Sequence, residues 1–129
     1  MPRKGSRHLT EGELRLMQVL WEKGTATVSD VVEAVSKTTK GAPPAYSTIL
    51  TTLRILERKG YVRHTKESRA FIYHPVVQRD KATDTAIAHL LRRFFDNSAE
   101  LLVLNLMERK QIDAETIKRL RKRIEEKKS

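Results

Sequence analysis

The segment AYSTILTTLRILERKG, residues 45–60, constrains the fold of this chain more than any other stretch. Its apolar residues Ile49, Leu53 and Leu56 recur at the spacing of one helix face, and Gly60 is a typical stop signal. The opposite face carries the polar side chains Ser47, Thr51, Arg54 and Arg58. We therefore expect a helix that buries one side and presents hydroxyl and guanidinium groups on the other.

The sequence before this segment predicts two further helices. The first begins after Thr10, which forms a capping-box pattern with Glu13, and ends at Gly24. Its expected core stripe consists of Leu14, Met17, Leu20 and Trp21. The second begins at Thr27 and ends in the loop KTTKGAPPA, residues 37–45. Its apolar face is expected to be Val28, Val31, Val32 and Val35, which recur at helical spacing.

The sequence after Gly60 predicts a β-hairpin. YVRHT and AFIYH are rich in aromatic and β-branched residues, the polar turn KESR at 66–69 separates them, and Pro75 ends the second strand. Three helices followed by a hairpin is the order of a winged helix-turn-helix. We therefore expect a mainly α chain with a flexible basic arm at 1–8 and a winged-helix DNA-binding domain at 9–75.

The outer face of the third helix is the candidate DNA-binding site. In a winged helix this helix enters the major groove, where short polar side chains and Arg read base edges. The predicted base-reading residues are Ser47, Thr51 and Arg54. The predicted backbone contacts are Tyr46, Arg58, Arg63, Lys66 and Arg69, and Lys59 is also expected to meet a phosphate. The alternative is a solvated face, but the basic wing that follows argues against it.

Charge and composition narrow the function classes. The net charge of +10 and the pI of about 10.2 favour an anionic partner such as nucleic acid or an acidic membrane surface. No cysteine is present, which excludes disulfides and thiolate metal sites. The four histidines, His8, His64, His74 and His89, show no metal-ligand spacing. We find neither a phosphate-cradling Gly loop nor a nucleophile elbow, so no metal, cofactor or enzymatic activity is expected.

The lengths of the apolar segments indicate where in the cell the chain is located. None approaches the ~18 residues that a membrane span needs. The basic start MPRKGSRH has no apolar stretch after it and is not a secretory signal. We expect a cytoplasmic protein that does not insert into membranes.

Residues 76–129 predict three more helices: one at about 80–95, one capped by Ser98 and one capped by Asp113. The second, AELLVLNLMER, is apolar nearly all round, and such a helix is buried. It either packs onto the winged helix of its own chain or is covered by a second copy. Its two amphipathic neighbours cover too little of it, so 76–129 is predicted to be a dimerisation domain. The predicted dimer contacts are Phe94, Phe95, Leu101, Leu102, Leu104, Leu106, Met107 and Leu120.

Five stretches together resemble one known family: LTEGELRLMQVLWEKG, TVSDVVEAV, AYSTILTTLRILERKGYVRH, RAFIYHP and SAELLVLNLMERKQIDAETIKRLRKRIEE. This is the BlaI/MecI penicillinase-repressor family, which includes CopY-type copper regulators. The resemblance spans Leu9 to Glu126. It implies a winged helix that binds palindromic operators with TACA/TGTA half-sites and a three-helix segment that dimerises by interlocking. It also implies repression of a nearby resistance operon.

The resemblance further implies a route of induction. Family members are inactivated when a membrane-bound sensor protease cuts the dimerisation helix at an Asn–Phe bond. Asn105 and Leu106 occupy the matching place here, with Leu instead of Phe. The Cys-x-Cys tail of the copper branch has no counterpart in a chain without cysteine.

The leading hypothesis is a homodimeric, sequence-specific repressor that is released from palindromic operators by loss of the dimer. The alternative is a winged-helix interaction module whose basic surface docks an acidic protein partner.

Overall fold

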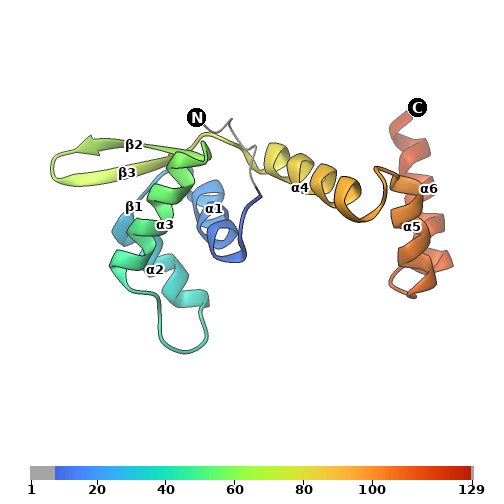
Figure 1. The fold of residues 1–129 in the computed structure, drawn as a ribbon, viewed down its shortest axis with the longest axis horizontal. Helices are drawn as coiled ribbons and strands as arrows, with labels where there is room; N and C mark the ends of the chain where they lie inside the picture. Colours follow the sequence, from blue (N-terminus) through green and yellow to red (C-terminus); the bar gives the residue numbers. More distant parts are fainter. Residues whose placement is uncertain (1–7, 129) are drawn as a thin grey trace. The chain divides into compact units, whose positions relative to one another are not determined.

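The computed structural model describes residues 8–128, so the basic arm expected at 1–8 lies outside the described residues apart from His8. The elements are α1 (Glu11–Lys23), β1 (Ala26–Thr27), α2 (Val28–Thr38), α3 (Tyr46–Arg58), β2 (Val62–Glu67), β3 (Ala70–Pro75), α4 (Arg79–Phe94), α5 (Ala99–Glu108) and α6 (Ala114–Lys128) (Figure 1). The chain divides into two compact units, Met1–Ile87 and Ala88–Ser129, which are described separately.

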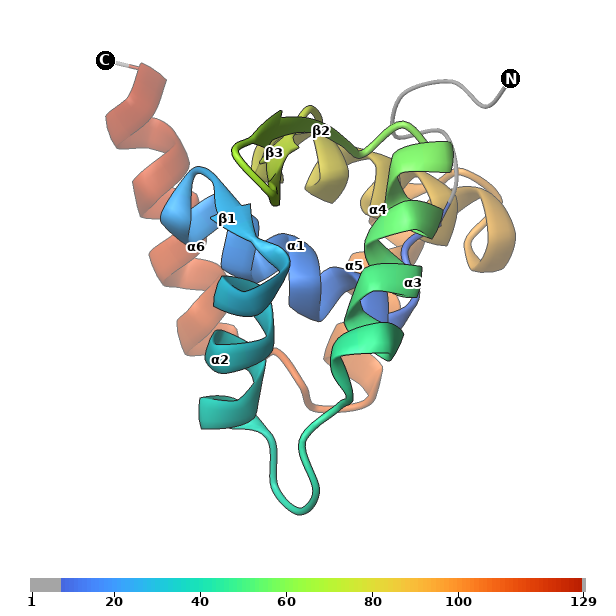
Figure 2. The same cartoon turned by 90° about the vertical axis from the view of Figure 1, so that its left-hand side faces the viewer.

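The first unit is a winged helix. Helices α1, α2 and α3 pack around one core, and the hairpin of β2 and β3 follows α3 (Figure 2). The three strands form an antiparallel sheet in the order β1-β3-β2. The expected winged helix-turn-helix is therefore confirmed, with β1 as an additional strand. Strand β1 was not predicted because its two residues are too few to show an alternating pattern.

The starts of α1 and α2 follow from side-chain caps. Thr10 Oγ1 accepts a hydrogen bond from the Glu13 amide at 3.2 Å, and Glu13 Oε1 accepts one from the Thr10 amide at 2.8 Å. Thr27 and Asp30 form the same reciprocal pair, with both distances 3.1 Å. Gly24 ends α1 with a φ of 85°, a left-handed conformation that suits glycine. The predicted starts and the first predicted stop are confirmed.

The core confirms most predicted positions and corrects one. Val28, Val31, Val35, Ile49, Leu53 and Leu56 are all buried. On α1, however, Leu14 is 37% exposed, and Leu16 is buried in its place. Leu16, Met17 and Leu20 lie three, four and seven residues after Glu13, which is itself only 4% exposed. The predicted stripe was wrong because it began at the apolar Leu14, whereas the buried face of α1 begins at the charged Glu13.

The wing is longer than expected and has a tighter turn. Strands β2 and β3 pair from Val62↔Pro75 to Glu67↔Ala70, which leaves Ser68 and Arg69 as the turn. Ser68 has a φ of 53°, as one residue of a two-residue hairpin turn often requires. The turn expected at 66–69 was therefore too long, since Lys66 and Glu67 lie within β2, opposite Phe71 and Ala70.

The first unit continues past the hairpin into α4. Trp21 donates its indole N–H to the Val77 carbonyl at 2.9 Å, and Val77 and Ala82 are buried in the same core. The Arg79 guanidinium lies 5.4 Å from the centre of the Trp21 ring. The unit thus ends later in the chain than the domain boundary expected after Pro75.

Trp21→Phe is expected to lower the free energy of unfolding by about 1–3 kcal/mol. The substitution keeps an aromatic ring but leaves the Val77 carbonyl without its donor. Denaturant unfolding followed by circular dichroism measures the loss. Arg79→Gln is the control, because it removes only the cation–π contact, which is worth about 0.5–1 kcal/mol at an exposed site. An equal loss in the two variants would contradict the role given to the hydrogen bond.

The second unit contains the end of α4 with α5 and α6. Asp96 and Asn97, both at positive φ, turn the chain between α4 and α5. Ser98 Oγ accepts a hydrogen bond from the Leu101 amide at 3.0 Å, and Asp113 Oδ1 accepts one from the Thr116 amide at 2.8 Å. Both predicted caps are confirmed, and the hydrogen bonds to Thr116 lower the pKa of Asp113. No helix within residues 8–128 has the length and apolar character to cross a bilayer.

Candidate nucleic-acid interface

Helix α3 presents a continuous polar face. Ser47, Thr51 and Arg54 are exposed, whereas Ile49, Leu53 and Leu56 on the other side are at most 2% exposed. Tyr46, in the first turn, is 52% exposed, and Arg58 extends the same polar face to the last turn. The structure therefore brings the three predicted base-reading residues together on one accessible helix surface.

The wing carries the other predicted phosphate contacts, and all of them are exposed. Because strand side chains alternate, Lys66 shares a face of β2 with His64, whereas Arg63 points to the opposite face. The Lys66 ammonium lies 5.8 Å from the centre of the Phe71 ring. Arg69 lies in the hairpin turn. The structure thus places Lys66 on the side of the wing that meets α3, with Arg63 on the other side.

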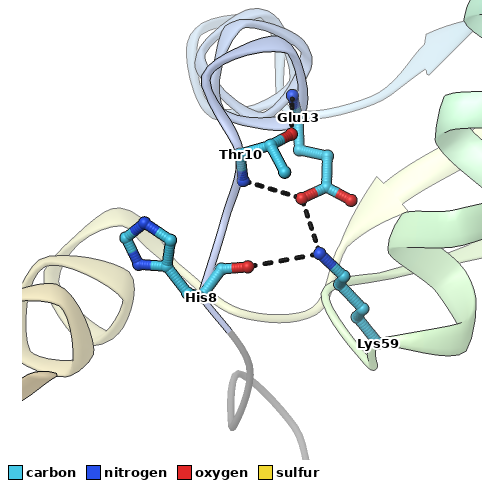
Figure 3. Close-up of polar contacts among 4 residues, drawn as sticks. All are labelled: His8, Thr10, Glu13 and Lys59. Carbon is cyan, nitrogen blue, oxygen red and sulfur yellow. Dashed lines mark hydrogen bonds and ion pairs between the residues drawn. The ribbon is translucent and has the colours of Figure 1, made fainter.

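The Lys59 side chain is only 16% exposed and forms an ion pair, which contradicts the expectation that it contacts phosphate. Its ammonium lies 2.7 Å from Glu13 Oε1 and donates to the His8 carbonyl at 3.2 Å (Figure 3). The same carboxylate oxygen accepts the Thr10 amide. Burial by itself raises the pKa of Glu13, but the hydrogen bonds from Lys59 and Thr10 outweigh it and lower the pKa overall. Lys59 is therefore a structural cation that ties the end of α3 to the start of α1.

A hydrogen bond between His64 and Glu57 lies on the α3 side of the wing, and sequence analysis missed it. His64 Nδ1 on β2 lies 2.6 Å from Glu57 Oε1 on α3. Both side chains are more than a third exposed, at 40% and 36%. Arg54, Glu57, Arg58 and His64 line a shallow hollow of ≈420 Å³. No periodic signal links Glu57 with His64, because the chain changes from helix to strand between them. Among residues 8–128, no cluster of three or more His, Asp or Glu side chains forms a metal site.

The predicted dimer residues fall into two groups in the second unit. Phe94, Leu104, Met107 and Leu120 are 43–67% exposed. Phe95, Leu101, Leu102 and Leu106 are half-buried. No described residue of α5 or α6 is buried. Three further apolar residues of this unit, Leu90, Val103 and Ile124, are also exposed. They recur with the predicted dimer residues at i, i+3 and i+4 spacing along each helix.

The Asn105–Leu106 bond lies within α5. The Asn105 side-chain amide donates to the Leu101 carbonyl at 3.0 Å, and both Asn105 and Leu106 are half-buried. A protease must unwind this part of the helix before the bond becomes an extended substrate.

The three-helix core, the hairpin and the exposed polar face of α3 define a winged-helix protein. The sequence model of the penicillinase repressor family matches residues 9–126, and the chain belongs to that family. The chain is 31% identical to the penicillinase repressor of Bacillus licheniformis over 94% of its own length and 92% of that protein. It is 21% identical to the methicillin resistance regulatory protein MecI of Mammaliicoccus sciuri over 88% of its length and 89% of that protein.

A solved structure also resembles the first unit. The solution structure of the DNA-binding domain of the repressor BlaI superposes with a TM-score of 0.52 at 30% sequence identity. The match covers 61% of this chain and 93% of that domain. The resemblance to the BlaI/MecI family, stated from the sequence alone, is thereby confirmed.

Proposed function

We propose that this chain is a transcriptional repressor that binds palindromic double-stranded DNA operators as a homodimer in the cytoplasm. The observation that carries the proposal is the exposed polar face of α3, with the cationic wing beside it. Three similar proteins support it: the penicillinase repressor, the methicillin resistance regulatory protein MecI, and the repressor BlaI, whose DNA-binding domain has the same fold. Membership of this family favours a regulator over an enzyme.

The chemistry of the α3 face suits the major groove. Ser47 and Thr51 have short side chains, so the helix backbone can approach the base edges closely. Arg54 is long enough to reach them and can donate two parallel hydrogen bonds to guanine O6 and N7. We therefore assign base reading to these three residues.

The remaining polar residues of the surface suit the DNA backbone. Tyr46 offers a hydroxyl at the start of α3, and the four cations offer charge-assisted hydrogen bonds to phosphate. These cations are Arg58, Arg63, Lys66 and Arg69. Phosphate contacts supply affinity that falls with rising salt and do not depend on the base sequence.

The second unit explains why the operator is expected to be palindromic. Its exposed apolar side chains include Phe94 at 67% and Leu104 at 47%, and a chain that stays alone leaves this surface in water. A second copy with two-fold symmetry would cover the same patch on both chains. Two winged helices joined in this way present two α3 faces to two symmetric half-sites.

Loss of the dimer is the proposed route of derepression. Cleavage at the Asn105–Leu106 bond would remove the end of α5 and the whole of α6 from the chain. Neither helix has a buried residue among those described, so little packing within the chain opposes local unwinding. A membrane-bound sensor protease is the partner that this reaction requires.

Arg54→Ala and Lys66→Ala are expected to weaken DNA binding in different ways. Arg54→Ala should reduce the preference for the operator over random duplex by about 1–3 kcal/mol, because it removes a base contact. Lys66→Ala should weaken binding to both duplexes alike and lower the slope of log affinity against log salt by about one per chain. Fluorescence anisotropy titrations at several salt concentrations measure both effects.

The control for this pair is Lys37→Ala, a surface lysine that belongs to α2 and forms an ion pair with Glu33 of the same helix. Its operator affinity should stay close to that of the unaltered chain. An equal loss on random duplex from Arg54→Ala and Lys66→Ala would contradict base reading by Arg54. If no duplex is bound and an acidic protein is bound instead, the alternative interaction module is the better account.

A further inference from the structure

His64 is held in one orientation between the wing and α3. Its Nδ1 atom lies 2.6 Å from Glu57 Oε1 on α3. On β3, the Phe71 ring meets the imidazole edge-on, with a centroid distance of 5.3 Å and an interplanar angle of 86°. The Tyr73 ring lies 5.6 Å away on the same strand. The imidazole is therefore fixed in direction, although the side chain remains 40% exposed.

The contact with Glu57 also fixes which nitrogen carries the hydrogen. An ionised carboxylate only accepts hydrogen bonds, so Nδ1 is the donor. In the neutral ring Nε2 then carries a lone pair, and only the protonated ring has a second N–H there. Among the described residues, none forms a hydrogen bond with Nε2. The exposed edge of this histidine thus changes from acceptor to donor when the ring takes up a proton.

The surroundings of this edge are cationic. Arg54 and Arg58 on α3 line the same hollow of ≈420 Å³ as Glu57 and His64. Lys66 lies on the same face of β2 as His64. From β3, the Tyr73 hydroxyl is uncharged, because burial raises its pKa and the Glu57 carboxylate raises it further. Glu57 is thus the one carboxylate among these groups, and the hollow favours an anion.

We propose that Arg58 and protonated His64 together bind one phosphate of the DNA backbone in this hollow, and that Glu57 is the positioning residue. This inference rests on the proposed function and adds His64 and Glu57 to the residues assigned to it. With the ring protonated, Nε2–H donates to a phosphate oxygen while Nδ1–H stays on Glu57. With the ring neutral, the Nε2 lone pair faces the phosphate and the Glu57 charge is unbalanced. DNA affinity therefore rises when the ring takes up a proton, which a lower pH favours.

The test measures operator affinity of the full chain by anisotropy from about pH 8 to about pH 5.5 at constant ionic strength. We expect each chain to contribute a roughly tenfold gain at the acidic end, as one charge-assisted hydrogen bond provides, so a dimer on two half-sites should bind roughly a hundredfold more tightly. His64→Gln should abolish most of this difference.

The matched control is His74→Gln on the same hairpin. His74 belongs to the opposite face of the wing, where its Nε2 lies 2.9 Å from the Thr65 hydroxyl. This variant should keep the full pH dependence. Glu57→Gln should bind more tightly at about pH 8 and depend less on pH, because an amide neither repels phosphate nor fixes the neutral ring with its lone pair outward.

A duplex with an uncharged methylphosphonate at the phosphate in question locates the contact. Moving this substitution along the backbone should reveal one position per half-site that removes the pH dependence in the unaltered chain and has little further effect in His64→Gln. If the pH dependence of operator binding survives His64→Gln, or disappears equally in His74→Gln, the proposed phosphate site is overturned. Either result leaves the proposed function standing. Failure to bind any duplex at any pH would overturn the proposed function as well.

Discussion

A full-length chain with Leu104→Asp and Leu120→Asp is expected to be monomeric and to bind an inverted-repeat operator roughly 10²- to 10⁴-fold more weakly than the unaltered chain. Both side chains are exposed in the single chain, at 47% and 43%, so the carboxylates cost little in a monomer. In a dimer they would be buried without partners, which is costly. The second half-site would then no longer be bound at the high effective concentration that a linked unit provides.

Two measurements test the variant with Leu104→Asp and Leu120→Asp. Sedimentation gives the mass in solution, and anisotropy gives the affinity for an inverted repeat and for a single half-site. Half-site affinity should stay within about twofold, since the α3 face is unchanged. The control is Gln111→Asp with Ala114→Asp, which adds the same two charges at exposed positions of the same unit. If the Leu104 and Leu120 variant remains dimeric, or the control dissociates equally, the apolar surface is not the dimer contact.

Lys59→Met is expected to lower the free energy of unfolding at neutral pH by about 3–5 kcal/mol. Glu13 is only 4% exposed, and the substitution leaves its carboxylate buried without its cation. Adding Glu13→Gln should restore much of this stability, because the glutamine oxygen still accepts the Thr10 amide and no buried charge remains. Denaturant unfolding of the single and double variants measures the recovery.

The contribution of Glu13 to stability should depend on pH in opposite directions in the unaltered chain and in Lys59→Met. In the unaltered chain the pKa of Glu13 is lowered from its ordinary value of 4.5, so this stabilisation is present above that pH and is lost as the pH falls below it. In Lys59→Met burial acts on Glu13 without the lysine, which favours the protonated carboxyl. The deficit of the variant should therefore be largest at neutral pH and should shrink in acid. A deficit that is constant with pH would contradict the account of the pair.

The helices of the first unit could be predicted because their signals are local. Thr10 and Thr27 start their helices with reciprocal caps, and Ile49, Leu53 and Leu56 mark a buried face by spacing alone. The wing could be predicted as a hairpin, but its turn could not be placed. Ser68 adopts the left-handed conformation without being glycine, so the sequence gives no sign of the two-residue turn.

The pairings across the fold could not be predicted. Lys59 and Arg58 are adjacent cations in the sequence, yet the ion pair with Glu13 takes Lys59 into the interior and leaves Arg58 on the surface. Glu57 and His64 are brought together only by the direction in which β2 leaves α3. Glu13 is likewise buried because it pairs with a residue far along the chain, so its burial could not be predicted from local sequence. The face of α1 that is buried includes Glu13 and could not be predicted either.

The most direct test of the account is the mass and stoichiometry of the complex between the full chain and a selected inverted-repeat duplex. Sedimentation at near-physiological salt should give two chains per duplex, and tighter binding than to an otherwise identical duplex in which one half-site is scrambled. One chain per duplex, with equal affinity for the intact and the scrambled DNA, would contradict the claim that two α3 faces act together.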